Sequence, residues 1–246
     1  MDNKKYIESA KKSIKKGLSV DDLIKRQIDA FDALNKSENL LFKTAYDLLF
    51  LYFPEAASLI KGKDQFINMM KKINEISYDE IASILKINSE SMGYDLPKEG
   101  KDTLSALIKE IDEIEKTKAV IEEKIENIMQ KEYPNLLSIG EPILIARLIR
   151  LSNGVRKLSM MPSSKIQVLG AEKNLFSKSR RPKYGVIFSH PLISNSKDPG
   201  KAAKTLASTI SIAARADVIS KKDIKDELMK RISKISKENK NGNYKG

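Results

Sequence analysis

LSALIKEIDEIEKTKAVIEEKIENI, residues 104–128, is the stretch of sequence that decides the fold. Apolar residues recur in it at alternating spacings of three and four, the pattern of a coiled-coil seam, and only Lys118 interrupts the series. The seam residues that we expect to be buried are Leu104, Leu107, Ile111, Ile114, Ile121, Ile125 and Ile128. Glu and Lys fill the positions between them, and Pro134 ends the run. The sequence therefore predicts a long coiled-coil helix.

A second long helix is predicted upstream. Ser19 and Asp22 form a capping-box pattern, and apolar residues then follow at helical spacing as far as Pro54. A helix of roughly 30 residues is about 45 Å long. We expect the two helices to form an antiparallel arm, with residues 55–100 as a small helical tip. A long helix inside an ordinary bundle is the alternative.

Composition favours an all-α protein and disfavours several classes of function. The 246 residues include 11 Gly, 8 Pro and no Trp, which favours helix over sheet. The absence of Cys and the single His exclude disulfides, thiol nucleophiles and the usual multi-histidine metal sites. No apolar run approaches the roughly 18 residues of a membrane span. We expect a soluble protein without metal, cofactor or enzymatic activity.

The two halves of the chain differ in charge. Residues 143–246 contain 23 Lys and Arg against 7 Asp and Glu, a net +16, whereas residues 1–142 carry −4 of the total +12. Clustered cations are what neutralisation of nucleic-acid phosphates requires. We therefore predict that the second half of the chain binds nucleic acid. A generally basic surface is the alternative.

The block of residues 161–176 is predicted to contain a short extended piece, a Gly turn and a new helix that starts at Gly170-Ala171-Glu172-Lys173. A helix start exposes unpaired backbone N–H groups, and here a lysine adjoins them, which suits a phosphate. The next predicted contacts lie in a basic loop, namely Lys178, Arg180, Arg181 and Lys183. A solvated loop is the alternative.

The loop is followed by Ser189 and His190, and then by an Ala-rich helix that begins near Gly200. A hydrogen-bonding structural role for His190 is favoured over a catalytic one, because no partner motif is present. The spacing of Lys201, Lys204 and Arg215 lets these cations share one helix face. Ser189, His190 and these three cations complete the predicted RNA-binding set.

Taken in order, several blocks resemble the Nop-domain family, and most closely its archaeal member in box C/D RNA–protein particles. The resemblance covers roughly residues 53–220, and the blocks that carry it are Pro134-Asn135-Leu136, residues 146–149, Met161-Pro162, residues 166–173, residues 182–185, His190-Pro191 and residues 213–215. Asn174 and Ser177 depart from the family's pattern, which puts contacts at these two positions in doubt.

The resemblance implies a non-catalytic scaffold. Its Nop domain would recognise a kink-turn in the guide RNA together with a small ribosomal-protein-like subunit bound there, and its coiled coil would self-associate. The methyltransferase fibrillarin would dock on a separate N-terminal domain and carry out guided 2′-O-methylation of rRNA or tRNA. Residues 1–18 are too few to form that docking domain, so we expect a truncated or naturally short member. The resemblance further implies cytoplasmic localisation in an archaeon, or a nucleolar one in a eukaryote.

The helix over residues 143–152 is expected to face the kink-turn-binding protein through Ile145, Arg147 and Ile149, with Gln167 nearby. The predicted segments are an arm and tip (1–142), a Nop domain (143–220), and a basic C-terminal helix with a frayed tail (221–246). Two alternatives stay open: a relative of the spliceosomal Nop-domain factor without a methyltransferase partner, and a coiled-coil structural protein with incidental basic charge.

Overall fold

The computed structural model describes residues 6–11, 17–55, 60, 62–70, 83, 92–94, 97–171 and 184–241. Every regular element in these ranges is helical, which confirms the predicted all-α class. The chain forms two compact units, residues 31–120 and residues 1–30 together with 121–246.

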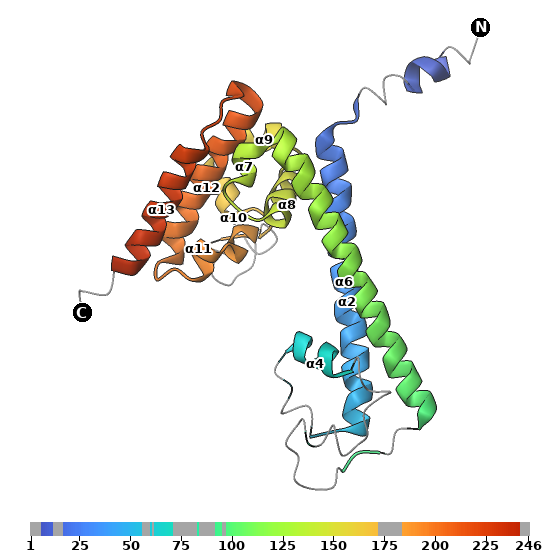
Figure 1. The fold of residues 1–246 in the computed structure, drawn as a ribbon. Helices are drawn as coiled ribbons and strands as arrows, with labels where there is room; N and C mark the ends of the chain where they lie inside the picture. The colour runs from blue at the N-terminus through green and yellow to red at the C-terminus, as the bar shows by residue number, and fades with distance from the viewer. Residues whose placement is uncertain are drawn as a thin grey trace, which may run out of the picture. The chain divides into compact units, whose positions relative to one another are not determined.

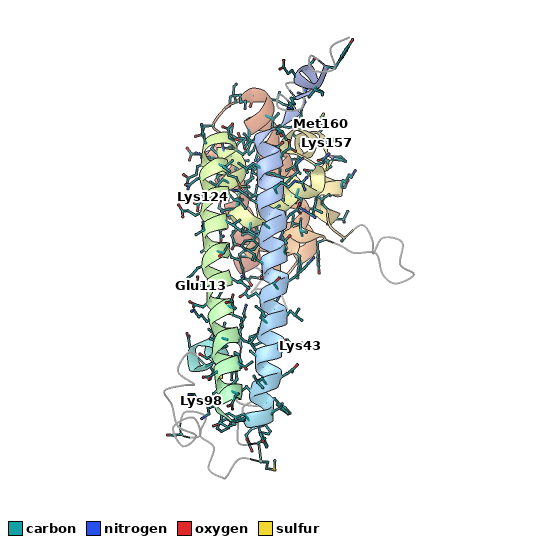
Figure 2. All side chains as sticks on the ribbon, turned by 90° about the vertical axis from the view of Figure 1, so that its right-hand side faces the viewer. Lys43, Lys98, Glu113, Lys124, Lys157 and Met160 are labelled. Carbon is teal, nitrogen blue, oxygen red and sulfur yellow. The ribbon has the colours of Figure 1, made fainter. Side chains whose placement is uncertain are left out.

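The unit of residues 31–120 contains most of two long helices, α2 (Val20–Tyr52) and α6 (Lys98–Glu132), which lie side by side in both views (Figures 1 and 2). The two helices are antiparallel, because Glu38 pairs with Lys118 whereas Tyr52 lies beneath the ammonium of Lys101. The predicted hairpin is thus present. One half of the predicted capping box is present at the start of α2, since the backbone N–H of Ser19 donates to Asp22 Oδ2 at 2.9 Å, and the Ser19 hydroxyl donates to the same oxygen at 2.9 Å.

Helix α4 (Lys63–Met70) is the described part of the tip. Phe66, Ile67 and Met70 are buried in one cluster with Leu49 of α2 and Ile108 of α6. Phe66 meets Phe42 edge to face at 5.1 Å between ring centroids. The tip helix therefore extends the apolar core of the arm.

The buried seam of α6 differs from the predicted one at every second position. Leu104, Ile111 and Ile125 are fully buried, as expected. Ile108 and Met129 are buried at two of the four alternate positions, and the half-buried Glu115 and Glu122 stand at the other two. The residues predicted there lie half-buried on the flank: Leu107, Ile114, Ile121 and Ile128. Two heptad registers have Leu104, Ile111 and Ile125 in common and differ at the alternate positions. Packing against α2 decides which of the two registers is buried.

A buried carboxylate interrupts the apolar seam. Glu38 is only 1% exposed and forms ion pairs with Lys118 and with Lys63, the first residue of α4. Lys118 also donates to Asn35 Oδ1 at 3.2 Å. Burial alone would raise the pKa of Glu38, but the hydrogen bonds from the two lysines outweigh burial and lower it. A polar layer of this kind sets the register of a coiled coil.

The other unit consists mainly of short helices around α12 (Figure 1). Their bounds are α7 (Pro134–Leu137), α8 (Pro142–Ser152), α9 (Val155–Met160), α10 (Ser163–Val168), the 3-10 turn η2 (Val186–Ser189), α11 (Pro191–Ser194), α12 (Pro199–Arg215), the π-helical turn η3 (Ala216–Ser220) and α13 (Lys225–Asn241). Ala202, Ala203, Ala207 and Ala214 are buried on α12, and their small side chains allow neighbouring helices to approach closely.

The units do not coincide with the predicted segments, whose first boundary lay at residue 142. The first turns of α2 and the last turns of α6 belong with the short helices. Asp21 accepts a hydrogen bond from the Tyr133 hydroxyl at 2.7 Å and another from the backbone N–H of Val155 at 3.0 Å. One carboxylate therefore joins the start of α2, the end of α6 and the start of α9.

A second buried carboxylate fixes the C-terminal part of this unit. Asp217 accepts from the backbone N–H groups of Asn135 and Leu136 at 3.0 and 2.9 Å, and from the Asn135 amide at 2.7 Å. Burial raises the pKa of Asp217, although these hydrogen bonds oppose the rise. Asn135 Oδ1 in turn accepts from the backbone N–H of Ile224, which positions the chain that enters α13.

Candidate nucleic-acid interface

The two ends of the predicted basic loop lie against each other. The N–H of Gly185 donates to the carbonyl of Gln167 at 2.8 Å, and the N–H of Val186 donates to that of Leu169 at 2.9 Å. Six predicted RNA contacts fall between these ends and lie outside the described residues: Glu172, Lys173, Lys178, Arg180, Arg181 and Lys183. The described residues on the two sides of this segment are therefore hydrogen-bonded to each other and form its base.

Two glycines allow this close approach. A Cβ at Gly185 would lie 1.9 Å from the carbonyl oxygen of Leu169. Gly170 has φ +88°, a left-handed conformation that side chains disfavour, and a Cβ there would lie 2.6 Å from Val186. Gly170 and Ala171, both predicted to approach RNA, thus lie at the closed base of the loop.

Residues 163–168 form helix α10, where the sequence had predicted an extended piece, so that expectation was wrong. Pro162 precedes the helix in an extended conformation, and Ser163 and Ser164 occupy its first turn. Tertiary contacts of α10 with α12 and η2 stabilise a helix too short to be stable by itself.

Three predicted cations share the exposed face of α12. Lys201, Lys204 and Arg215 are all exposed, and the residues between them that point the other way are buried. Asp198 caps the helix by accepting the backbone N–H of Lys201 at 3.0 Å. Arg215 donates from Nε to the carbonyl of Ser159 at 2.9 Å, which orients its guanidinium. These positions are accessible for phosphate contacts.

His190 has a structural role, and its predicted contact with RNA was wrong. The ring is 8% exposed, and Nδ1 accepts the backbone N–H of Leu192 at 3.1 Å as the cap of α11. Nε2 lies 2.9 Å from the carbonyl oxygen of Ile139, to which it donates in the matching tautomer. Neither ring nitrogen is left for a ligand, whereas the neighbouring Ser189 is exposed.

Two of the predicted protein-partner residues also need correction. Ile145 and Ile149 are fully buried, so they stabilise the domain and do not face a partner. Helix α8 is apolar around most of its circumference, which is typical of a helix enclosed by others. Arg147 and Gln167 are half-buried and remain accessible in part.

An aromatic pair that the sequence did not single out follows the loop directly. Tyr184 and Phe188 stack with ring centroids 4.4 Å apart and an interplanar angle of 9°. Phe188 is 41% exposed, and Tyr184 is partly covered. The sequence signal that could have identified this pair is two aromatic residues, four positions apart, directly after a run of basic residues.

Within the described ranges, no cluster of three or more potential metal-ligating side chains occurs. No helix among the described residues has both the length and the apolar character that a membrane crossing needs. The described features that suit contact with RNA are exposed cations, the base of the basic segment and a stacked aromatic pair.

Comparison with known proteins assigns the chain to a family. The sequence model described as "Nop: snoRNA binding domain, fibrillarin" matches residues 30–238. A NOP5 family protein of Methanocaldococcus jannaschii is 34% identical over 246 aligned positions, which cover 92% of this chain and 59% of that protein. Nucleolar protein 58 of Schizosaccharomyces pombe is 32% identical, covering 83% and 44%. Nucleolar protein 56 of Dictyostelium discoideum is 30% identical, covering 82% and 41%.

A chain in the crystal structure of a fibrillarin/Nop5p complex is similar with a TM-score of 0.45 and 23% identity, over 88% of this chain and 74% of that one. The chain spans about half the length of the curated relatives that it matches. Because the family model covers most of its residues, from within α2 to within α13, the chain belongs to the Nop family.

Proposed function

We propose that this chain is a non-catalytic, RNA-binding scaffold of a box C/D guide ribonucleoprotein. The observation that carries the proposal is the match of a snoRNA-binding family model to residues 30–238. The net charge of +16 on residues 143–246 supports it, since phosphate contacts dominate RNA affinity. The domain would recognise a kink-turn RNA together with the small ribosomal-protein-like subunit bound to it.

The described RNA-facing positions in this proposal are Gly170, Ala171, Ser189, Lys201, Lys204 and Arg215. They lie on α12 and on the segments next to α10 and η2, which contact α12. The basic segment 172–183 belongs to the same proposed surface. It lies between Gly170 and Gly185 in the sequence, and the chain on its two sides is joined by hydrogen bonds. Arg147 and Gln167 are the candidates for contact with the protein subunit.

The arm has a separate role in the proposal, which is self-association. Its own seam is filled within the chain, so a second copy would use the outer surface, where Leu40 and Leu51 of α2 are exposed. Fibrillarin would be a further partner. Localisation would be the cytoplasm of an archaeon, or the nucleolus in a eukaryote.

A mobility-shift assay on a kink-turn RNA, with and without the kink-turn-binding subunit, tests the proposal. Because two linked contacts raise the effective concentration of the second, affinity for the preassembled complex should exceed that for either component by about 100-fold or more. Equal affinity for the complex, the RNA alone and a duplex of equal length would show a generic polycation instead.

Salt dependence tests the cationic face. The Lys201→Ala/Lys204→Ala variant should lower affinity and reduce the slope of log affinity against log salt by about 0.7–0.9 for each phosphate that is no longer neutralised. The matched control is Lys43→Ala/Lys124→Ala, two exposed lysines on the arm (Figure 2). Equal effects of the two double variants would refute this assignment.

A further inference from the structure

Among the described residues, Tyr184 and Phe188 form a stacked pair, whereas the other aromatic pairs are tilted or edge to face. In the arm, Phe42 meets Phe66 at an interplanar angle of 77°, and Tyr52 meets Phe53 at 81°. Both of these edge-to-face pairs include a fully buried ring. Tyr184 and Phe188 are parallel within 9°, and Phe188 is 41% exposed. Phe188 thus stays partly exposed although Tyr184 stacks on one face of its ring.

We propose that this stacked pair is a platform on which an unpaired nucleobase stacks, so that the base becomes the third ring of the stack. A flat, solvated aromatic face is the feature with which proteins hold single-stranded RNA, because every base has a π-face. This inference rests on the proposed RNA-binding function and adds to it a contact that depends on unpaired bases.

The position of the pair favours a nucleobase over an apolar protein group. Tyr184 directly follows Lys183, the last residue of a segment with four cations in eight residues, 177–184. Gly185 and Val186, which lie between the two rings in sequence, are hydrogen-bonded to residues 167 and 169 at the C-terminal end of α10, and α10 exposes Lys165. Cations beside a stacking face provide the phosphate contacts that accompany base stacking.

The framework under Phe188 is rigid, as a stacking platform requires. Ile187 is fully buried, and Ser189 donates from its hydroxyl to the carbonyl of Val186 at 3.0 Å. His190, which caps α11, is held to Ile139. The turn η2 is thus fixed on both sides of the exposed ring, and little conformational entropy is lost when a base stacks on it.

The absence of tryptophan from the chain permits a direct test. The Phe188→Trp variant carries one indole at the platform, and the Phe50→Trp variant carries one on the arm, where Phe50 is 47% exposed. Titration with a single-stranded oligoribonucleotide should quench and shift the fluorescence of the Phe188→Trp indole, because a stacked base contacts it. A paired RNA duplex should produce a much smaller change, and Phe50→Trp should respond to neither RNA.

Affinity measurements complete the test. Phe188→Leu should weaken binding of the single strand by about 5- to 150-fold, the effect of losing one stacked base, with the salt slope unchanged. Phe50→Leu, the same substitution on the arm, should leave affinity unchanged. Unchanged melting of both variants, followed by circular dichroism, would show that folding is not the cause.

Four outcomes would overturn the platform. RNA binding unaffected by Phe188→Leu would remove it and leave the proposed function intact. Equal losses on single strand and duplex would show a contact that does not read unpaired bases. A loss confined to binding of the kink-turn-binding subunit would make the pair a protein interface. Failure of the unmodified protein to bind any RNA at low salt would overturn the proposed function as well.

Discussion

Removal of the Lys118 ammonium should destabilise the arm more than any change to its exposed charges. Glu38 is 1% exposed, whereas Lys118 is 18% exposed. In Lys118→Leu, the buried carboxylate keeps Lys63 as its ion-pair partner among the described residues. Breaking a buried pair in this way costs about 3–5 kcal/mol, and we expect the lower end of this range because Lys63 remains.

At about 2–4 °C per kcal/mol for a chain of this size, the melting temperature should fall by roughly 6–12 °C. Thermal and urea unfolding, followed by circular dichroism, measure the loss. The double variant Glu38→Leu/Lys118→Leu removes both charges together, and its stability should return to within about 1 kcal/mol of the original or exceed it.

The matched control is Lys116→Leu, two residues away on the same helix. Lys116 is 63% exposed and pairs with Asp112 and Glu113 on the surface, so its loss should cost less than about 1 kcal/mol. If Lys118→Leu and Lys116→Leu have equal effects, or if the double variant is as unstable as Lys118→Leu, the polar layer does not contribute as the geometry indicates.

The same layer predicts a pH dependence: the folded-state pKa of Glu38 is lowered, so its stabilisation is present above the ordinary value of 4.5 and is lost as the pH falls below it. Urea midpoints of Glu38→Gln should therefore depend less on pH in that range, and an identical acid profile would contradict the assignment. Gly185→Ala should open the loop base and cost more than about 2 kcal/mol, because its Cβ would overlap the Leu169 carbonyl, whereas Gly200→Ala, with no contact closer than 3.5 Å, should be tolerated in thermal melts. Asn135→Ala should cost about 2–4 kcal/mol in urea unfolding, since it leaves Asp217 and the N–H of Ile224 short of partners, and a loss below about 0.5 kcal/mol would refute that network.

Sequence alone determined the helical class, the two long helices, the start of the first and the residue at which each one ends. The second helix begins at Lys98, inside the predicted tip. Heptad spacing, the Ser19–Asp22 capping pattern and Pro134 act locally along the chain, so these features can be read without knowledge of distant contacts. The Nop resemblance was also available from motif order, and the family match confirmed it.

Tertiary structure decided which of two overlapping heptad registers is buried, because Leu107 and Ile108 are equally apolar and only the face of α2 selects between them. It also buried Ile145, Ile149 and His190, which the sequence placed at interfaces. Hydrogen bonds between residues more than 80 positions apart, such as those of Asp217 with Asn135 and Leu136, leave no periodic trace in a sequence. Pairing of distant polar groups and the choice among equally apolar faces depend on three-dimensional packing, and for that reason only the folded chain reveals them.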